Sequence, residues 1–522
     1  GWMIHQGEER MMVKESEIVP GLYKCFDEGI VNARDHYVRM SQKIARLDEL
    51  GKSHQHKRVT TIDISVNKAN GMITIMNDGD GIDVEKHPEH DMWIPEMIFG
   101  HLRTSTNYKK NETKIVGGKN GFGFKLVLIY SKWGKIETID HHRGLKYVQE
   151  FKDNLSVIEK PKITKCKTKP YTKVSWIPDY TRFGLAGLST DMESLLYKRC
   201  IDISAVTDKN VKVKYNGTPI QVKTFEQYID LFVGTKTESK RIYEKSNDRW
   251  EYAVCLSPTD EFTQVSFVNG IYTGKGGKHV EYILNQITRK IVDFIEKKKK
   301  VKVKPVTIKE QLMLFVNCVV ENPSFDSQTK DTLNTSSTSF GSNCKVSDKF
   351  IEKVCKLGII EQALSIHQVK VVKQTKKTDG KKTKTLYGIP KLIDANFAGT
   401  TKSKDCTLIL CEGDSAKAGI VSGMSKEDRN FMGVYPLKGK LMNVRDVTKA
   451  RVGENKEITE IKKIMGLVTN KEYKTRDDIN TQLRYGKIVL LTDQDLDGIH
   501  IKGLCVNMFD SEWNSLIRDD KF

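Results

Sequence analysis

The sequence lacks the segments that would place it in or across a membrane. No apolar run approaches the roughly 18 residues of a membrane-spanning helix. The first residues do not show the basic-then-apolar pattern of a secretory signal peptide. These two absences predict an intracellular chain with no membrane partner.

Cysteine and histidine patterns typical of metal sites are also missing. The 10 cysteines are scattered without a Cys-x-x-Cys pair, so the sequence predicts neither a disulfide framework nor a zinc site. His87, His90, His141 and His142 fall in polar turns, without further ligands at a fixed spacing. We interpret these histidines as solvated, and most cysteines as reduced core residues.

Negative charge is scarce relative to positive charge. Lys and Arg number 86 against 67 Asp and Glu, which gives a formal net charge of +19. Such a surplus attracts polyanions, so nucleic acid is the leading partner, although excess charge can also serve solubility alone. The 522 residues are enough for roughly three domains with buried cores.

Residues 117–125 form a glycine-rich stretch, with four glycines in its first seven positions. Such a loop lets backbone N–H groups approach phosphate oxygens, although an ordinary turn explains many glycine-rich stretches. It is not a Walker loop, because Phe124 separates Gly123 from Lys125 and no Ser or Thr follows. It is also a poor match to a dinucleotide-binding fingerprint. Any further ligand contacts must come from elsewhere in the chain.

Residues 22–40 predict a helix with functional side chains on its polar flank. Its apolar positions recur at three- and four-residue spacing: Leu22, Phe26, Ile30 and Ala33. Glu28 and Asn32 share a face of this helix and can address one ligand. A carboxylate can activate water, and an amide oxygen can hold magnesium. A solvated polar face is the alternative.

A β-hairpin and two polar turns follow the helix. Residues 58–66 and 72–76 alternate apolar and polar, with the turn Asn70-Gly71 between them. The second strand runs into Asn77-Asp78-Gly79-Asp80-Gly81-Ile82, and a short helix near residues 95–102 precedes the triplet Ser105-Thr106-Asn107. Each turn could be ordinary by itself.

Lysine is concentrated in two runs. Six lysines occur within residues 296–304, a density that suits duplex phosphates but also a solvated helix end. The second run, residues 370–384, predicts a flexible linker. We expect a domain boundary near it.

Acidic residues follow two predicted strands, residues 406–411 and 487–492. Glu412 ends the first strand, and Asp493, Asp495 and Asp497 follow the second. Acids at the carboxyl ends of strands predict a metal site, and carboxylates without soft ligands favour magnesium. A calcium loop is excluded because its twelfth position would be Leu504 instead of glutamate.

Taken together, the helix with Glu-x-x-x-Asn, the Asn-Asp-Gly-x-Gly-Ile turn and the glycine loop resemble the ATP-binding fold shared by gyrase, mismatch-repair clamps, heat-shock chaperones and histidine kinases. Residues 19–28, 94–102 and 117–125 are more similar to type IIA DNA topoisomerases of the eukaryotic kind. The resemblance extends to residues 321–330, 412–416, 436–445 and 493–498.

The resemblance implies roles for the nucleotide site, with ATP and Mg²⁺ as cofactors. Glu28 would be the general base, Asn32 a magnesium ligand and Asn77 the adenine contact. The ribose and phosphate contacts would be Ser105, Thr106 and Asn107. The lid would comprise Gly118, Lys119, Asn120, Gly121, Phe122, Gly123, Phe124 and Lys125. Departures from the family pattern are Thr106, Lys119 and Phe124, where the family usually has serine, arginine and alanine.

The resemblance also implies a switch loop and sites for metal and duplex DNA. Gln328, Thr329 and Lys330 would contact the γ-phosphate, with Gln328 and Lys330 acting in catalysis. The metal ligands would be Glu412, Asp493 and Asp495, with Asp497 a nearby third acid. The DNA contacts would be Lys297, Lys298, Lys299, Lys300, Lys438, Lys440 and Asn443.

We therefore expect a multidomain α/β (α+β) chain. Residues 1–217 would form a Bergerat-type ATPase sandwich, 218–358 a transducer domain with a mixed sheet and helices, 359–404 a linker region and 405–522 a Toprim α/β domain. The expected activity is that of an ATP-dependent type II topoisomerase, which passes one duplex through a transient break in another. The alternative is a related clamp or chaperone ATPase without DNA cleavage.

Three further expectations come from the resemblance. The full-length enzyme would be a homodimer in the nucleus, or in the cytoplasm for a virus that replicates there. The family's N-terminal arm and its winged-helix domain would lie outside these 522 residues. Tyr485 follows Arg484, as the DNA-cleaving tyrosine does, but it precedes the Asp493 strand, so we do not expect it to be the nucleophile.

Overall fold

The computed structural model describes residues 1–101, 114–116, 123–259, 261–366 and 378–522. These residues form two compact units, 1–363 and 364–522. Over the described ranges, the first unit contains two large sheets and a short two-stranded one, and the second unit contains one sheet. This mixture of helices and sheets confirms the expected fold class.

The first large sheet of unit 1 is mainly antiparallel and carries the predicted hairpin. Within the described residues its strand order is β11-β10-β3-β4-β9-β5-β6-β7, with β8 also paired to β6. The strands are β3 (Thr61–Asn67), β4 (Met72–Asp78), β5 (Ser131–Asp140), β6 (Leu145–Lys152), β7 (Val157–Ile158), β8 (Lys162–Lys165), β9 (Tyr171–Pro178), β10 (Lys212–Tyr215) and β11 (Thr218–Pro219). Strand β3 pairs with β4 in antiparallel register, with Ile64 opposite Ile75. The predicted hairpin is confirmed.

Helix α1 (Pro20–Glu49) is the predicted helix, extended at both ends. Proline suits its first turn because the amide hydrogen that proline lacks would have no partner there. The predicted apolar stripe is buried: Leu22, Phe26, Ile30 and Ala33 are at most 4% exposed. The stripe therefore fixes which way the polar flank of the helix faces.

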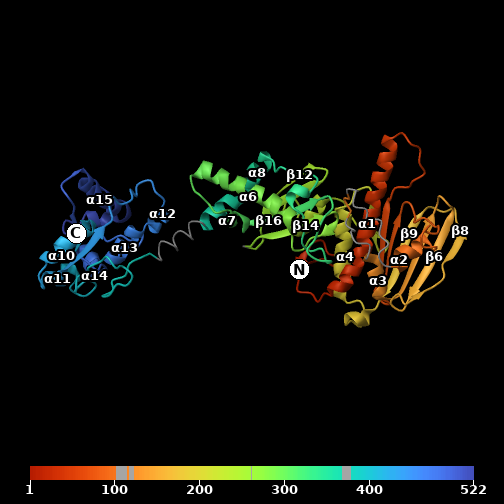
Figure 1. Ribbon diagram of the computed structural model, residues 1–522, viewed down its shortest axis with the longest axis horizontal. Coiled ribbons are helices and arrows are strands. Elements are labelled where there is room, and N and C mark those ends of the chain that lie inside the picture. The colour runs from red at the N-terminus through yellow and green to blue at the C-terminus, as the bar shows by residue number, and fades with distance from the viewer. Residues whose placement is uncertain (102–113, 117–122, 260, 367–377) are drawn as a thin grey trace. The chain divides into compact units, whose positions relative to one another are not determined.

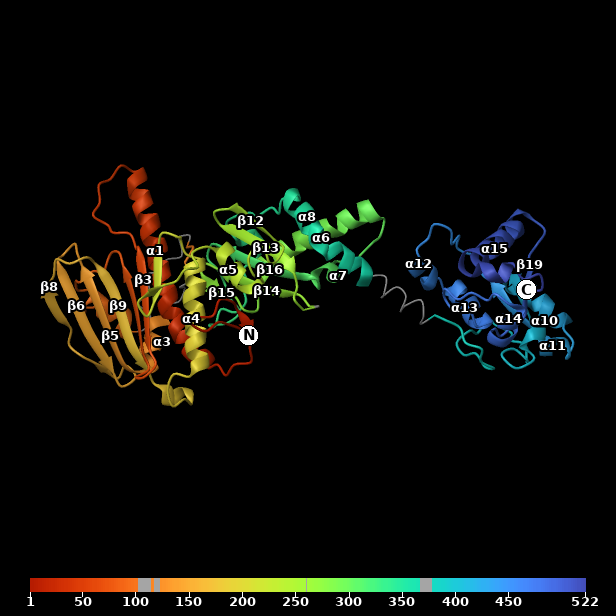
Figure 2. The ribbon, with the colours of Figure 1, turned by 180° about the vertical axis from the view of Figure 1, so that it is seen from behind.

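The other helices of this part are α2 (Ile94–Gly100), α3 (Gly123–Ile129), α4 (Thr190–Ala205) and α5 (Phe225–Val233). Short strands β1 (Trp2–Met3) and β2 (Met12–Val13) pair with each other near the N-terminus. Figures 1 and 2 show α1, α3 and α4 between the first large sheet and the second. Side chains of α1 can therefore meet residues from both sheets.

The second large sheet has the order β12-β13-β16-β14-β15. Its strands are β12 (Arg241–Asn247), β13 (Trp250–Leu256), β14 (Thr263–Val268), β15 (Ile271–Tyr272) and β16 (Leu312–Cys318). Helices α6 (Lys278–Lys299), α7 (Pro305–Lys309) and α8 (Asp348–Val354) accompany it. The buried apolar stripe of α6 includes Ile283, Ile287 and Ile291, all 0% exposed. The loop after β16 carries the predicted switch residues.

Unit 2 is built on the parallel sheet β18-β17-β19, with β17 (Thr407–Glu412), β18 (Met432–Leu437) and β19 (Lys487–Leu491). Its helices are α10 (Gly413–Gly423), α11 (Asp428–Phe431), α12 (Lys449–Glu454), α13 (Lys456–Met465), α14 (Arg476–Gln482) and α15 (Leu496–Ile517). Parallel pairing of β17 with β19 places the ends of both predicted strands at one edge of the sheet. The acids that follow both strands therefore share that edge.

The second lysine-rich run is only partly as predicted. Residues 370–377 lie outside the described residues. The chain from Thr378 onward packs against the rest of unit 2. The Gly380 amide donates to the Leu467 carbonyl at 2.8 Å, and Asp379 lies 2.5 Å from the Lys462 ammonium. The expectation of a flexible linker is therefore wrong for residues 379–384. These residues make specific hydrogen bonds and an ion pair with the rest of unit 2, which the lysine-rich composition does not indicate.

Candidate functional site

Glu28 lies at a meeting point of segments that are distant in the sequence. Its side chain is 9% exposed, and the ammonium groups of Lys24 and Lys330 each lie 3.1 Å from its Oε1 atom. Lys330 is 302 residues away and belongs to the loop after β16. The predicted switch lysine thus contacts the predicted general base.

A cavity of about 330 Å³ adjoins Glu28. Its lining residues are Gly21, Lys24, Cys25, Glu28, Gly123, Leu126, Tyr130, Phe183 and Gln328. A Cβ atom at Gly123 would lie 2.2 Å from Glu28 Oε2, so only glycine fits there without movement. Glu28, the end of the glycine-rich loop and the switch loop are therefore brought together around one cavity.

Buried charges on α1 and α4 support this site. Asp27 Oδ2 lies 2.8 Å from Lys24 Nζ, and Asp27 Oδ1 accepts from Arg199 Nε at 2.7 Å. Burial by itself raises the pKa of Asp27, but Lys24 and Arg199 outweigh it and hold that pKa well below its ordinary value. Asp27 therefore stays ionised and fixes Lys24 beside Glu28.

Two buried arginines connect the helices to the second large sheet. Arg34 Nη1 donates to the Asn269 carbonyl at 2.9 Å, and Arg199 Nη2 donates to the Gly270 carbonyl at 2.7 Å. These partners sit in the turn between β14 and β15. Neither arginine could be identified from the sequence, because nothing local in the sequence pairs residues so far apart.

The other predicted nucleotide residues that the structure describes lie on neighbouring elements. Asn32 follows Glu28 by one turn on α1 and is partly buried. Asn77 is the penultimate residue of β4, is 7% exposed, and donates from Nδ2 to the Asp78 carbonyl at 2.9 Å. Lys125 is 2% exposed, and burial lowers its pKa. Thr329 is exposed beside Lys330 and donates from Oγ1 to Asp331 at 2.9 Å.

Phe124 is a core residue. Its ring packs edge-on against Phe99 and Trp176, with centroid distances of 5.4 and 5.5 Å. Its side chain is therefore committed to packing, and only its backbone is available to a ligand. The remaining predicted contacts lie outside the described residues: Ser105, Thr106, Asn107, Gly118, Lys119, Asn120, Gly121 and Phe122.

The predicted metal acids lie at the carboxyl edge of the unit 2 sheet. Glu412 Oε2 accepts from the Asp493 amide at 3.4 Å, which joins the ends of β17 and β19. Asp495 caps α15 by accepting from the Gly498 amide at 2.7 Å. Among the described residues, these acids do not form a group whose ligand atoms all lie within 4.8 Å of one another. They offer oxygen donors alone, as a hard divalent cation prefers.

Three predicted DNA contacts lie in unit 2, and one of them borders these acids. Lys440 Nζ lies 2.9 Å from Asp497 Oδ1, and this hydrogen-bonded pairing lowers the pKa of Asp497. Asn443 Oδ1 accepts from Asn507 on α15 at 2.9 Å. Lys438 is exposed, and its amide donates to Glu457 at 2.6 Å. The predicted phosphate contacts and metal acids thus occupy one side of unit 2.

The first lysine run is exposed at the end of α6. Lys297, Lys298 and Lys299 form its last turn, and Lys300 caps it with a φ of 57°. Lys298 Nζ lies 4.5 Å from the centroid of the Phe294 ring. Cations at a helix C-terminus are favourable by themselves because they complement the helix dipole. The run therefore has a structural explanation beside the predicted contact with DNA.

Tyr485 is inaccessible as a nucleophile. The side chain is 0% exposed, its hydroxyl donates to Asp394, and it accepts from the Ala395 amide at 3.0 Å. Burial, reinforced by Asp394, raises the pKa of Tyr485 well above its ordinary value. The location and the chemistry of this hydroxyl agree with the expectation that it does not attack DNA.

The interpretation of the turn histidines as solvated is wrong for His141, whereas His142 is exposed as expected. The side chain of His141 is only 14% exposed, and Nε2 atoms of His141 and His142 each lie 3.7 Å from the Asp80 carboxylate. His90 is exposed as expected, and its ring stacks on that of His87 at 4.9 Å. The sequence could not place His141 and His142 beside Asp80, because strand pairing brings these residues together.

Three family models match the chain. The model of the histidine kinase-, DNA gyrase B- and HSP90-like ATPase matches residues 18–163. The DNA gyrase B model matches residues 223–385, and the Toprim model matches residues 407–520. The Toprim match supports the topoisomerase interpretation over the clamp or chaperone alternative.

Similar proteins include DNA topoisomerase 2 of Pisum sativum, which is 45% identical over 99% of this chain and 34% of its own length. DNA topoisomerase 2 of Acanthamoeba polyphaga mimivirus is 42% identical over 100% of this chain and 40% of its own length. The chain thus spans about a third of the length of the first curated relatives it matches.

Solved structures agree with these matches. The ATPase region of Saccharomyces cerevisiae topoisomerase II is 39% identical, with a TM-score of 0.63, over 70% of this chain and 91% of that one. The ATPase and transducer domains of Balamuthia mandrillaris DNA topoisomerase II are 38% identical, with a TM-score of 0.64, over 71% of this chain and 91% of that one. The chain belongs to the type II DNA topoisomerase family.

Proposed function

We propose that this chain is the ATP-hydrolysing and Toprim portion of an enzyme that passes one DNA duplex through a transient, magnesium-assisted break in another. The observation that carries the proposal is the contact of Lys330 with Glu28, 3.1 Å across 302 residues of sequence, beside a cavity. A purely structural ion pair would have no need of an adjoining cavity and a glycine held against the carboxylate.

Within the cavity, Glu28 would accept the proton of the attacking water. Bound ATP would supply the γ-phosphate as the electrophile. Lys330 would hold the negative charge that develops there, while Lys24, fixed by Asp27, would keep the Glu28 carboxylate oriented. Gln328 lines the same cavity and would position the phosphate.

The remaining nucleotide contacts would come from α1 and from β4. Asn32 would hold the Mg²⁺ that accompanies ATP, since an amide oxygen is a suitable hard ligand. Asn77 would contact adenine at the end of β4.

In unit 2, Glu412, Asp493 and Asp495 would hold Mg²⁺, with Asp497 close by. Their chemistry fits, because they bring oxygen atoms from the ends of two strands to one sheet edge. The metal would supply charge stabilisation at a scissile phosphate. Lys438, Lys440 and Asn443 would position that strand, and residues 297–300 would contact a duplex through phosphate charge.

We further propose that two chains close around bound nucleotide and that the enzyme works in the nucleus, or in the cytoplasm for a virus that replicates there. Sedimentation with a non-hydrolysable ATP analogue tests the first proposal. A shift from monomer to dimer on adding the analogue is expected, and an unchanged sedimentation coefficient would contradict it.

The proposed function is tested by measuring ATP hydrolysis with and without duplex DNA. We expect Mg²⁺-dependent hydrolysis that duplex DNA stimulates, and loss of hydrolysis in Lys330→Ala with duplex binding retained. A chain that binds no ATP, or that hydrolyses it equally well without Lys330, would contradict the proposal. Binding of unfolded protein in place of duplex DNA would instead favour a chaperone.

A further inference from the structure

Histidines gather around one buried aspartate in unit 1. Among the residues that the structure describes, five histidines touch Asp80 or one another there: His36, His54, His56, His141 and His142. Asp80 is 7% exposed and lies in the turn after β4. The proposed ATPase mechanism assigns no role to any of these side chains.

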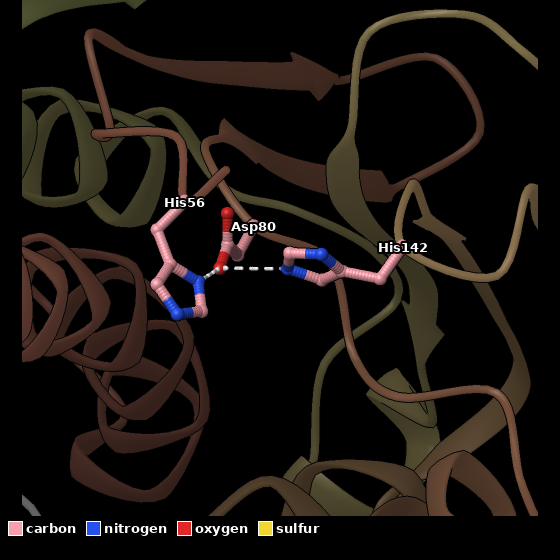
Figure 3. Close-up of side chains that lie close together, drawn as sticks. All are labelled: His56, Asp80 and His142. Atoms are coloured by element: carbon pink, nitrogen blue, oxygen red, sulfur yellow. Dashed lines mark hydrogen bonds and ion pairs between the residues drawn. The ribbon is translucent and has the colours of Figure 1, made fainter. Parts of the chain in front are cut away.

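Three of these residues bring ligand atoms to one point. His56 Nδ1 lies 2.5 Å from Asp80 Oδ2, and His142 Nε2 lies 3.7 Å from the same oxygen. One ligand atom from each residue falls within 4.8 Å of the other two, and the two imidazole rings flank the carboxylate (Figure 3). The residues come from three separate segments: the chain before β3, the turn after β4 and the turn between β5 and β6.

These distances suit a small divalent transition-metal ion. Bonds of about 2.0–2.2 Å in a tetrahedral site place neighbouring ligand atoms roughly 3.3 Å apart. The observed 2.5 and 3.7 Å lie on either side of that value, so small side-chain rotations are sufficient. Two imidazoles and one carboxylate favour zinc over magnesium, which prefers oxygen ligands alone.

We propose that His56 Nδ1, Asp80 Oδ2 and His142 Nε2 bind Zn²⁺, with a fourth coordination position left for water or a further ligand. In the metal-free protein the proton between His56 and Asp80 occupies the position that the metal would take. Metal binding would displace that proton from Nδ1, and His56 would then bind as a neutral imidazole with its proton on Nε2.

The surroundings already orient the proposed ligands. Asp80 Oδ1 accepts from the Lys57 amide at 2.7 Å, and the Asp80 carbonyl accepts from His36 Nε2 at 2.8 Å. His141 Nε2 donates to the Gln55 carbonyl at 3.0 Å, which ties the segment of His56 to the turn of His142. Hydrogen bonds of this kind hold the ligands of metal sites in place.

The turn of Asp80 has little freedom to move away. A Cβ atom at Gly81 would lie 2.0 Å from the Ile139 carbonyl oxygen, so the turn packs directly against the backbone of β5. His142 follows the end of the same strand. Asp80 and His142 are therefore held near each other by the sheet, whether or not a metal is bound.

A simple hydrogen bond is the alternative explanation. It accounts for His56, whose Nδ1 lies at bonding distance from Asp80. It does not account for His142, because 3.7 Å is too long for a hydrogen bond. The metal proposal explains both histidines.

The test is calorimetric titration of the whole chain with Zn²⁺ in excess Mg²⁺, which occupies sites made of oxygen alone. We expect one equivalent of Zn²⁺ to bind, and a His56→Ala/His142→Ala variant to lose affinity at least about 100-fold, since losing even an outer partner of a ligand costs ~10–100-fold. The matched control is His87→Ala/His90→Ala, which removes two histidines from the exposed group of His87, Glu89 and His90. The control should bind as the parent does.

A second readout covers the case in which the double variant folds poorly. His142 is exposed enough for His142→Ala to be tolerated, and Co²⁺ absorbs visible light strongly in tetrahedral sites. The parent should develop that absorption and His142→Ala should not. Absence of Zn²⁺ binding in the parent, unchanged binding in both His142 variants, or loss only in the His87/His90 control would each overturn the proposal. None of these measurements depends on ATP hydrolysis.

Discussion

Within the described part of the chain, Lys24 and Lys330 are the cations that contact Glu28, and replacing Lys330 by alanine removes one of them. The Lys330 and Glu28 side chains are both less than 10% exposed, so the contact between them is shielded from solvent. Hydrogen bonds to charged groups stabilise by about 1.5–3 kcal/mol. Because Lys24 remains 3.1 Å from the same carboxylate, the Glu28 charge keeps a partner and the destabilisation should stay within that range. The unit should therefore unfold at a lower denaturant concentration but still fold.

The effect of Lys330→Ala on hydrolysis should be larger than its effect on stability. Removing a group that stabilises developing charge costs about 10²–10³ in rate. Single-turnover hydrolysis at saturating ATP separates this effect from nucleotide binding and product release. The control is Lys275→Ala, a nearby lysine that is 73% exposed and 3.9 Å from its partner Asp331. Equal hydrolysis rates in the two variants would refute the reasoning.

Three other predictions follow from the described contacts. Replacing residues 297–300 with alanine should weaken duplex binding and flatten its salt dependence. The log-log slope should fall by up to ~0.9 for each phosphate that the variant no longer neutralises. An identical slope would show that these lysines are only exposed to solvent and do not contact DNA. The lowered pKa of Asp27 means that its ionised carboxylate stabilises the fold. This stabilisation is fully present above pH 3.8, the ordinary pKa, and is lost as the pH falls through the lower folded-state pKa. The Tm of Asp27→Asn, measured by calorimetry, should therefore fall less between neutral and acidic pH than the Tm of the parent, and parallel decreases would contradict this. Tyr485→Phe should lower stability by about 1–3 kcal/mol in denaturant titration, because the buried Ala395 amide loses its acceptor while Asp394 keeps Arg484 as a partner. Detergent trapping with plasmid should find no DNA linked to Tyr485 in the parent.

Elements with a clear periodicity could be predicted from the sequence. The apolar stripe of α1 and the alternation in β3 and β4 predicted these elements because burial of one face imposes a fixed spacing. The acids after β17 and β19 were placed at one sheet edge for a similar reason, since parallel strands end on the same side. Boundaries were less accurate, and α1 extends to Glu49 beyond the predicted Met40.

The contacts that assemble the site could not be derived from local patterns. The resemblance to a family suggested a role for Lys330, but nothing near Lys330 in the sequence indicates Glu28 as its partner. Arg34 and Arg199 bind backbone carbonyls of Asn269 and Gly270. Because every residue has a backbone carbonyl, the sequence does not indicate which ones accept side-chain hydrogen bonds. The His56, Asp80 and His142 cluster went unnoticed because strand pairing, rather than spacing, brings its members together.

The most direct test of the central claim is to compare Glu28→Gln with the parent chain in ATP binding and in single-turnover hydrolysis. Glutamine keeps the shape of the side chain but cannot accept a proton from water, so binding should persist while hydrolysis slows by about 10²–10⁴. A hydrolysis rate within about threefold of the parent rate corresponds to a difference of less than about 1 kcal/mol in activation free energy. That result would show that Glu28 is not the general base and would contradict the account.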